Sequence, residues 1–270
     1  MNLLKRVLIA VLFIPLMLFI FYKGSFYLFG MFGIIIFFGL IEFREMALKK
    51  NVKLDFFLPL FGFIFYSAIV KFGIFGFTAL FPIIFYLMIK NLFTNRLDGA
   101  VQEISTSVFG IIYIAGSLSL GYLVSLSENS NRVLPLLISL VWLTDSFAYF
   151  AGMTLGRKRN IFKTSPKKSI IGFVAGIIVP FVFVGLIYIF KTDFLELKYM
   201  LALAFATGIF GQLGDLFESI IKRDFGVKDS SNMIPGHGGI LDRFDSLFVS
   251  ITAYWFMIII IEYTLNRVNL

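Results

Sequence analysis

Long hydrophobic stretches, separated by short polar or charged segments, recur along the whole chain. A helix needs about 20 mostly apolar residues to cross a hydrocarbon core about 30 Å thick, and most of these stretches approach that length. Two pairs are joined by very short connections, at Lys23-Gly24 and at Lys71, which leaves the count open by one. The pattern predicts about nine transmembrane helices, at residues 5–22, 25–42, 55–70, 72–90, 104–126, 133–152, 170–190, 199–218 and 245–263.

The first stretch follows Lys5 and Arg6 and then turns apolar, a pattern that also fits a signal peptide. No small-residue cleavage site precedes Lys23. We therefore interpret this stretch as an uncleaved first helix.

Composition supports a location in the membrane. Hydrophobic residues make up 59% of the 270 residues and charged residues 15%, against about 25% charged in soluble domains. The mean hydropathy is +0.92, and the predicted fold class is an all-α polytopic integral membrane protein. Because the chain has no cysteine, it forms no disulfide, thiolate nucleophile or cysteine-ligated zinc site. We attribute the net charge of +8 to basic residues facing anionic lipid and expect no nucleic-acid partner.

The basic residues are distributed unevenly between alternate loops. If the N-terminus is cytoplasmic, 18 of the 24 Lys and Arg residues lie on its side and six lie on the other. This asymmetry predicts a cytoplasmic N-terminus and a C-terminus on the opposite side. Residues 1–132 are then N-terminal transmembrane helices that act as a scaffold. Residues 133–270 carry the C-terminal transmembrane helices and the two richest cytoplasmic loops, 153–169 and 219–244, where we expect the catalytic function.

The segment 219–245 combines charged residues with glycine and the only histidine of the chain. Gly236, Gly238 and Gly239 surround His237. Glycine permits positive φ and close backbone approach, both of which a phosphate-binding turn requires. A solvated positive-inside loop and an ordinary structural histidine are the alternative interpretations.

Four aspartates are predicted near headgroup depth on the cytoplasmic side. Asp242 and Asp245 are three residues apart, which on a helix places both on one face. Asp215 lies about one turn from the cytoplasmic end of its predicted helix, and Asp145 lies six residues before Ala151, about 9 Å along the axis. Unpaired carboxylates at this depth are costly unless something neutralises them, and oxygen ligands favour Mg²⁺ over zinc. Capped or paired structural aspartates are the alternative.

The loop before the seventh predicted helix is basic. It contains Arg157-Lys158-Arg159, Lys163 and Ser165-Pro166-Lys167-Lys168-Ser169. Attraction to anionic lipid would explain such a cluster. However, Lys167 and Lys168 directly precede a membrane helix, whose N-terminus attracts phosphate. Acids for a metal, paired cations and a glycine turn on one side suit phosphoryl or nucleotidyl transfer.

At this point the chain resembles a known family. Residues 219–245 are similar to the signature of the phosphatidate cytidylyltransferases, or CDP-diacylglycerol synthases. The matching positions are Ser219, Lys222-Arg223, Lys228-Asp229, Pro235-x-His237-Gly238-Gly239 and Asp242-Arg243-x-Asp245, with Trp142-x-x-Asp145-Ser146, Ser165-Pro166-Lys167-Lys168 and Gly211-Gln212-x-Gly214-Asp215 upstream. The resemblance covers about the last half of the chain. One position departs from the family pattern, because Ile171 stands where a glutamate is usual.

The resemblance implies that CTP and phosphatidate react to give CDP-diacylglycerol and pyrophosphate for phospholipid biosynthesis. It also implies dependence on Mg²⁺ and a homodimer. The scarcity of long loops suggests a prokaryotic inner (plasma) membrane, with the active site facing the cytoplasm.

Roles follow for residues that match the family motifs. We expect the metal to be held by Asp215, Asp242 and Asp245, in a site able to take a second cation. The catalytic set adds Lys222, Arg223, His237 and Arg243. The substrate-binding set comprises Asp145, Ser165, Lys167, Lys168, Gln212, Ser219, Lys228, Gly236, Gly238 and Gly239. Asp224 and Asp229 are interpreted as salt-bridge partners of neighbouring cations.

Three other functions fit parts of this sequence pattern. An ion-coupled transporter would use the headgroup-depth aspartates, but a polar track to the bilayer midplane is expected for transport and the acids cluster near one side. A CDP-alcohol phosphotransferase would carry Asp-Gly-x-x-Ala-Arg, and the sequence after Asp98-Gly99-Ala100 does not continue in that way. A noncatalytic membrane scaffold is favoured only by Ile171.

Overall fold

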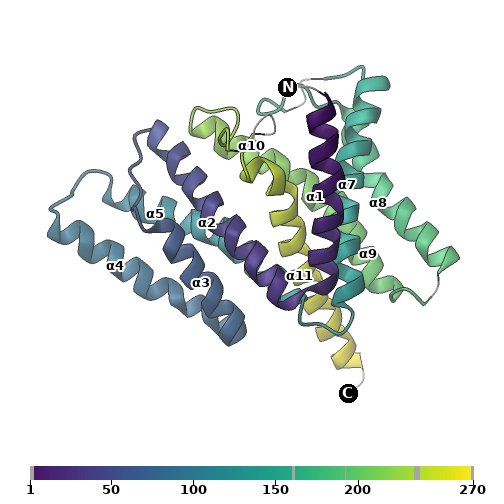
Figure 1. The fold of residues 1–270 in the computed structure, drawn as a ribbon, viewed down its shortest axis with the longest axis horizontal. Helices are drawn as coiled ribbons and strands as arrows, with labels where there is room; N and C mark the ends of the chain where they lie inside the picture. The colour runs from purple at the N-terminus through teal and green to yellow at the C-terminus, as the bar shows by residue number, and fades with distance from the viewer. Residues whose placement is uncertain (1–2, 160–161, 192, 234–237, 269–270) are drawn as a thin grey trace.

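Helices make up the regular structure of the chain (Figure 1). The computed structural model describes residues 3–159, 162–191, 193–233 and 238–268. Within these ranges no strand forms, and a single isolated bridge pairs Arg159 with Ser169. The all-α class predicted from the hydrophobic pattern is therefore confirmed.

The helices follow one another with few long connections. The α-helices are α1 (Leu3–Lys23), α2 (Ser25–Lys49), α3 (Leu58–Phe72), α4 (Leu80–Phe93), α5 (Ala100–Gly110), α6 (Ser117–Val124), α7 (Ser130–Thr154), α8 (Ile170–Phe190), α9 (Leu197–Phe205), α10 (Gln212–Asp224) and α11 (Leu241–Val268). Three short segments of other helix types continue them: the 3₁₀ helix η1 (Gly73–Ala79) and the π-helices η2 (Ile111–Gly116) and η3 (Ala206–Gly211).

Seven helical stretches of the described chain are long and apolar enough to cross a membrane. They are Ser25–Lys49, Leu58–Phe93, Ala100–Val124, Ser130–Thr154, Ile170–Phe190, Leu197–Asp224 and Leu241–Thr264. A shorter apolar helix covers Phe13–Lys23. The chain is thus a multi-span membrane protein, while the count of nine and the orientation stay predictions.

The difference from nine arises partly at the 36-residue stretch Leu58–Phe93, which covers two of the predicted helices. Gly73, with φ of 62°, ends α3, and η1 follows it directly. Figure 1 shows α3 and α4 leaving η1 as two separate rods. The predicted division near Lys71 is therefore present in the backbone, although the helical hydrogen bonding continues through it.

Helix α11 lies at the centre of the bundle (Figure 1). It packs against α6, α7, α9, α10 and η3, and α7 packs closely against α8. Helices α2 to α5 gather on one side of α11, and α7 to α9 gather on the other. As a result, the start of α11 lies beside α10 and near the ends of α7 and α8 that carry the predicted site.

Close contact between α10 and α11 depends on Gly214. A Cβ added there would lie 2.8 Å from the backbone oxygen of Asp245 and 3.1 Å from Val249. Small residues let membrane helices approach in this way. Because Asp215 follows Gly214, this contact brings Asp215 and Asp245 to the same place.

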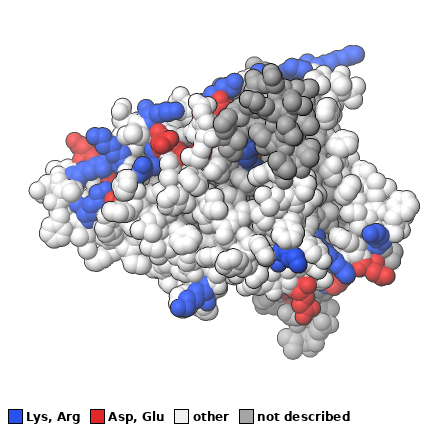
Figure 2. Space-filling view, in the orientation of Figure 1, with Lys and Arg blue, Asp and Glu red and all other residues white. Residues whose placement is uncertain are grey.

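Charged side chains lie along two opposite edges of the face shown in Figure 2, and a broad uncharged band separates them. Such a band fits a hydrocarbon layer. The two ends of the described chain lie at opposite ends of the bundle (Figure 1). This arrangement agrees with termini on opposite sides, and which side faces the cytoplasm stays a prediction.

Candidate active site

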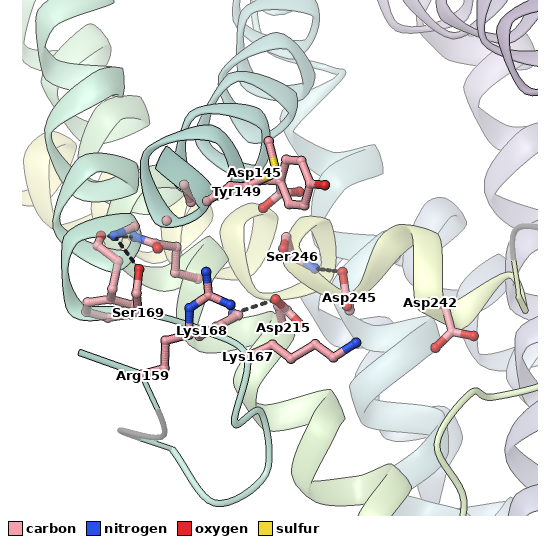
Figure 3. A pocket seen from close by; sticks show the side chains of 16 residues that line it. Asp145, Tyr149, Arg159, Lys167, Lys168, Ser169, Asp215, Asp242, Asp245 and Ser246 are labelled. Carbon is pink, nitrogen blue, oxygen red and sulfur yellow. Dashed lines mark hydrogen bonds and ion pairs between the residues drawn. The ribbon is translucent and has the colours of Figure 1, made fainter. Parts of the chain in front are cut away.

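A polar cavity of about 620 Å³ opens between α7, the start of α8, α10 and the start of α11 (Figure 3). It gathers residues from both segments that the sequence singled out. Its polar lining residues are Asp145, Tyr149, Arg159, Lys167, Lys168, Ser169, Gln212, Asp215, Asp242, Asp245 and Ser246. Seven of the predicted site residues therefore share one cavity: Asp145, Lys167, Lys168, Gln212, Asp215, Asp242 and Asp245.

The helix ends near two of the aspartates lie further along the chain than predicted. Asp215 lies nine residues before Asp224, the end of α10, and Asp145 lies nine residues before Thr154, the end of α7. At 1.5 Å per residue, each is about 13 Å from the end of its helix. Helix α10 extends six residues past the predicted end at 218, and α7 extends two residues past 152. The headgroup depth of both aspartates stays a prediction.

Lysines from the loop before α8 face the carboxylates. The Nζ of Lys168 lies 2.5 Å from Oδ2 of Asp215. Figure 3 shows Lys167 reaching between Asp215 and Asp242. Ser169 caps α8, because its Oγ accepts the N–H of Gly172 at 3.1 Å. The prediction that this lysine pair precedes a membrane helix is confirmed.

Asp242 is held by four donors from the protein. Its Oδ1 lies 2.6 Å from Nζ of Lys222. Its Oδ2 accepts the N–H of Gly239 at 2.8 Å, and it lies 2.9 Å from both the N–H and the hydroxyl of Ser230. Asp242 and Asp245 both lie in α11 and line the same cavity, as predicted.

The turn that contains Gly238 and Gly239 contacts Asp242. Gly238 has φ of 80°, the positive φ that the sequence indicated. The N–H of Gly239 points to Asp242, so in this arrangement that N–H serves the carboxylate and not a phosphate. Gly236 and His237 lie outside the described residues.

The other predicted residues that the structure describes are not among the residues that line the cavity. Lys222 is buried, and its Nζ contacts Oδ1 of Asp242. Arg223 donates from Nη1 to the carbonyl of Val227 at 3.1 Å. Ser165, Ser219, Lys228, Gly238, Gly239 and Arg243 are also not among the lining residues. Asp224 pairs with Lys50 at 2.6 Å, so it is a salt-bridge partner as predicted, but of a lysine 174 residues away and not of a neighbouring cation.

Sequence reasoning missed a buried glutamate beside the site. Glu218 is 1% exposed. Its Oε1 lies 3.3 Å from Nζ of Lys222, and its Oε2 accepts the hydroxyl of Tyr113 at 3.3 Å. The spacing of Glu218 and Lys222, four residues apart, is the signal that could have found this pair. Tyr149, Arg159, Ser169 and Ser246 were also not predicted as site residues.

Gln212 and Ile171 occupy different environments. The side-chain amide of Gln212 donates to the carbonyls of Phe173 and Gly208, so it ties α10 to α8 at the edge of the cavity. Ile171 is 40% exposed in the first turn of α8 and does not line the cavity.

The chemistry of the acidic side chains suits a hard divalent cation, because every candidate ligand is a carboxylate oxygen. Among the residues that the structure describes, however, no three His, Asp or Glu side chains stand close enough together to hold a metal ion. Lys168 and Lys222 engage two of the three predicted ligands. The metal role of Asp215, Asp242 and Asp245 stays a prediction.

A sequence model of the cytidylyltransferase family matches residues 4–261. The chain belongs to that family. This cytidylyltransferase is 33% identical to the phosphatidate cytidylyltransferase of Bacillus subtilis (strain 168) over 195 residues, which cover 71% of this chain and 70% of the relative. It is 34% identical to that of Rickettsia bellii over 184 residues, 66% of this chain and 80% of the relative.

A shorter match is closer in sequence. Over 107 residues, 39% of this chain and 41% of the relative, the cytidylyltransferase is 50% identical to the phosphatidate cytidylyltransferase of Staphylococcus haemolyticus. The chain is therefore a nucleotidyltransferase with bacterial relatives. The alternative of an ion-coupled transporter is not supported.

Proposed function

We propose that this cytidylyltransferase transfers CMP from CTP to phosphatidate, giving CDP-diacylglycerol and pyrophosphate for phospholipid synthesis. The family and the names of its relatives support the reaction class. The observation that carries the proposal is the polar cavity, in which Lys167, Lys168 and Arg159 stand among aspartates of membrane-spanning helices. A soluble nucleotide and a lipid headgroup can meet only at such a place.

The reaction forms a bond between a phosphatidate oxygen and the α-phosphorus of CTP, and it breaks the bond from that phosphorus to the oxygen of the β-phosphate. A phosphate monoester carries about −1.5 to −2 charge at pH 7, so the attacking oxygen is already ionised and needs no strong base. Both reactants are anions. Lys167, Lys168 and Arg159 would lower their repulsion and stabilise the charge that develops in transfer.

We also propose that Mg²⁺ acts here, held by Asp215, Asp242 and Asp245, in a site able to take a second cation. A bound Mg²⁺ would neutralise phosphate charge and orient the leaving group. Because Lys168 and Lys222 each hold one of these carboxylates, the cation would compete with two ammonium groups. Replacing either lysine would therefore change the concentration of Mg²⁺ required.

A second cavity, of about 780 Å³, would take the acyl chains of the lipid. It is almost entirely apolar and follows α10 and α11. Phe162 and Thr164, from the loop that carries Lys167, also line it. The loop thus borders both cavities, so a lipid whose chains fill the apolar one would have its phosphate near the lysines.

The orientation belongs to the same proposal. We place the cavity on the cytoplasmic face of a bacterial plasma membrane, as the 18 to 6 division of basic residues indicates, and the family resemblance supports a homodimer. The chain contains no cysteine, so single cysteines introduced at Lys158 and at Lys71 would report their sides by labelling intact cells. Labelling of Lys158→Cys from outside would contradict the orientation.

Pyrophosphate release from detergent-purified protein tests the function. Phosphatidate is supplied with CTP, UTP, ATP or GTP, in Mg²⁺ or in EDTA. We expect release only when phosphatidate, CTP and Mg²⁺ are present together. Release without phosphatidate, or equal release with all four nucleotides, would contradict the proposed reaction. Full release in EDTA would contradict the proposed dependence on Mg²⁺.

A further inference from the structure

Glu42, in α2, is a buried carboxylate whose hydrogen-bond partners, among the described residues, lie within 230–241, at and just before the start of α11. It is 0% exposed. Its Oε1 accepts the hydroxyl of Ser231 at 2.6 Å and the N–H of Ile240 at 2.8 Å. Its Oε2 accepts the N–H of Leu241 at 3.0 Å and lies 3.0 Å from the hydroxyl of Ser230. We call this group of contacts the Glu42 clamp.

The clamp caps a helix from a distant part of the chain. The N–H groups of Ile240 and Leu241 belong to the start of α11, where N–H groups have no partner within the helix. A carboxylate at a helix N-terminus is also favoured by the helix dipole. Glu42 supplies this carboxylate from 199 residues away from Leu241. The N-terminal helices therefore reach into the signature segment.

Ser230 connects the clamp to Asp242. Its hydroxyl lies 3.0 Å from Oε2 of Glu42 and 2.9 Å from Oδ2 of Asp242, and its N–H donates to Asp242. Space here is tight, because a Cβ on Gly239 would lie 1.9 Å from the hydroxyl of Ser230 and 2.6 Å from Glu42. The turn is thus held between one carboxylate from α2 and one from α11.

We propose that Glu42 is a positioning residue for the transfer reaction: the Glu42 clamp fixes the turn before α11 and thereby the orientation of Asp242 at the cavity. This inference rests on the proposed function, because it assigns Asp242 a part in that reaction. An ionised carboxylate is an acceptor only, which matches the three donors from Ser231, Ile240 and Leu241 and the hydroxyl of Ser230, whose single proton Glu42 shares with Asp242. An amide of the same shape would direct N–H groups toward donors and would release part of the turn.

The test compares Glu42→Gln and Glu42→Asp with Glu45→Gln. Glu45 lies on the same helix but is exposed, so its variant is the matched control. For each purified protein we would measure melting temperature, kcat and KM for CTP, and hydrogen exchange at the amides of Ile240 and Leu241. A merely structural role would lower the melting temperature and leave kcat per folded molecule unchanged.

We expect Glu42→Gln to lower kcat by about 10- to 100-fold, the range typical of groups that orient a functional ligand, and to speed exchange at Ile240 and Leu241. Glu42→Asp keeps the charge and should fall between the wild type and Glu42→Gln. Glu45→Gln should behave as wild type. Wild-type kcat in folded Glu42→Gln, while the wild type itself is active, would overturn the inference.

Failure of the proposed function and failure of the Glu42 clamp give different results. If the wild type releases no pyrophosphate, the proposed function fails, whereas unchanged exchange at Ile240 and Leu241 in Glu42→Gln refutes the clamp whatever the activity. If Glu42→Gln does not fold, the variant Ser231→Ala removes one donor to Glu42, makes no change at Ser230, which contacts Asp242 directly, and leaves α2 intact. A lower kcat in that folded variant would support the inference, and an unchanged kcat would overturn it.

Discussion

Two aspartates of the cavity are each held by a lysine from another segment, Asp215 by Lys168 of the loop before α8 and Asp242 by Lys222 of α10. Lys168 holds Asp215 where both side chains remain partly exposed, at 25% and 33%. Lys222 holds Asp242 where they are only 10% and 11% exposed. Breaking a buried pair leaves an uncompensated charge, which is far more costly than losing an exposed pair. These residues could be picked from the sequence by type and motif, but their partners could not, because partners are set by packing between distant segments.

Lys222→Met should strongly destabilise the protein. It removes the cation that faces both Asp242 and the buried Glu218, and such a loss typically costs about 3–5 kcal/mol. The matched control is Lys50→Met, which breaks the exposed pair with Asp224 and should cost under about 1 kcal/mol. Thermal unfolding in detergent measures both, and equal melting temperatures for the two variants would refute the difference.

Asp245→Asn should abolish most turnover while the protein stays folded. The substitution keeps the shape of the side chain and removes a charge that faces the cavity. We expect kcat to fall by about 10²–10³-fold, as when one electrostatic stabiliser of a transition state is lost. Pyrophosphate release at increasing Mg²⁺ measures the effect. Wild-type activity in this variant would remove Asp245 from the metal assignment.

At the scale of elements, the hydrophobic pattern located every predicted membrane helix on a helical stretch, but it ended several of them too early, such as α2, which continues from 42 to Lys49. The prediction stopped at residue 218, whereas α10 continues to Asp224. The part of α10 beyond 218 contains Lys222, which is buried against Asp242 and Glu218. Hydropathy records transfer to lipid and cannot register polar groups that satisfy one another inside the bundle.

Gly214→Ala should separate α10 from α11. The added Cβ would lie 2.8 Å from the backbone oxygen of Asp245, and overpacking of this kind costs about 1–3 kcal/mol. Gly185→Ala in α8 is the control, because a Cβ there meets nothing within 4 Å. We expect a lower melting temperature and lower kcat only for Gly214→Ala. Equal behaviour of both variants would show that α10 and α11 tolerate the change.

At the scale of the whole molecule, the two cavities meet at one loop. The polar cavity holds charge from α7, α10 and α11, and the apolar one is lined by α10 and α11 together with α5, η2 and α6. The sequence indicated the residues of the polar cavity, because they form motifs. The sequence did not indicate the apolar cavity, because its aromatic and aliphatic residues look like ordinary parts of membrane helices. It did not indicate Glu42 either, because a single acid in α2 belongs to no motif.

Leu213→Trp should raise KM for phosphatidate. Leu213 lines the apolar cavity and is 43% exposed, so a larger side chain would fill space that the acyl chains need. We expect about a tenfold increase, equivalent to about 1.4 kcal/mol of lost binding, with KM for CTP unchanged. Leu186→Trp, at an exposed leucine of α8 outside both cavities, is the control. Unchanged KM for phosphatidate in Leu213→Trp would place the acyl chains elsewhere.

The Glu42 clamp also sets an order of events during synthesis. A chain is made and inserted from its N-terminus, so Glu42 enters the membrane among the first residues. Its donors at Ile240 and Leu241 follow only when almost the whole chain has been translated. Until then α2 carries a carboxylate without these donors, and the turn before α11 has no anchor. A nascent chain therefore contains Lys167, Lys168 and Asp215 well before it can form the finished site. The enzyme becomes competent only at the end of its own translation.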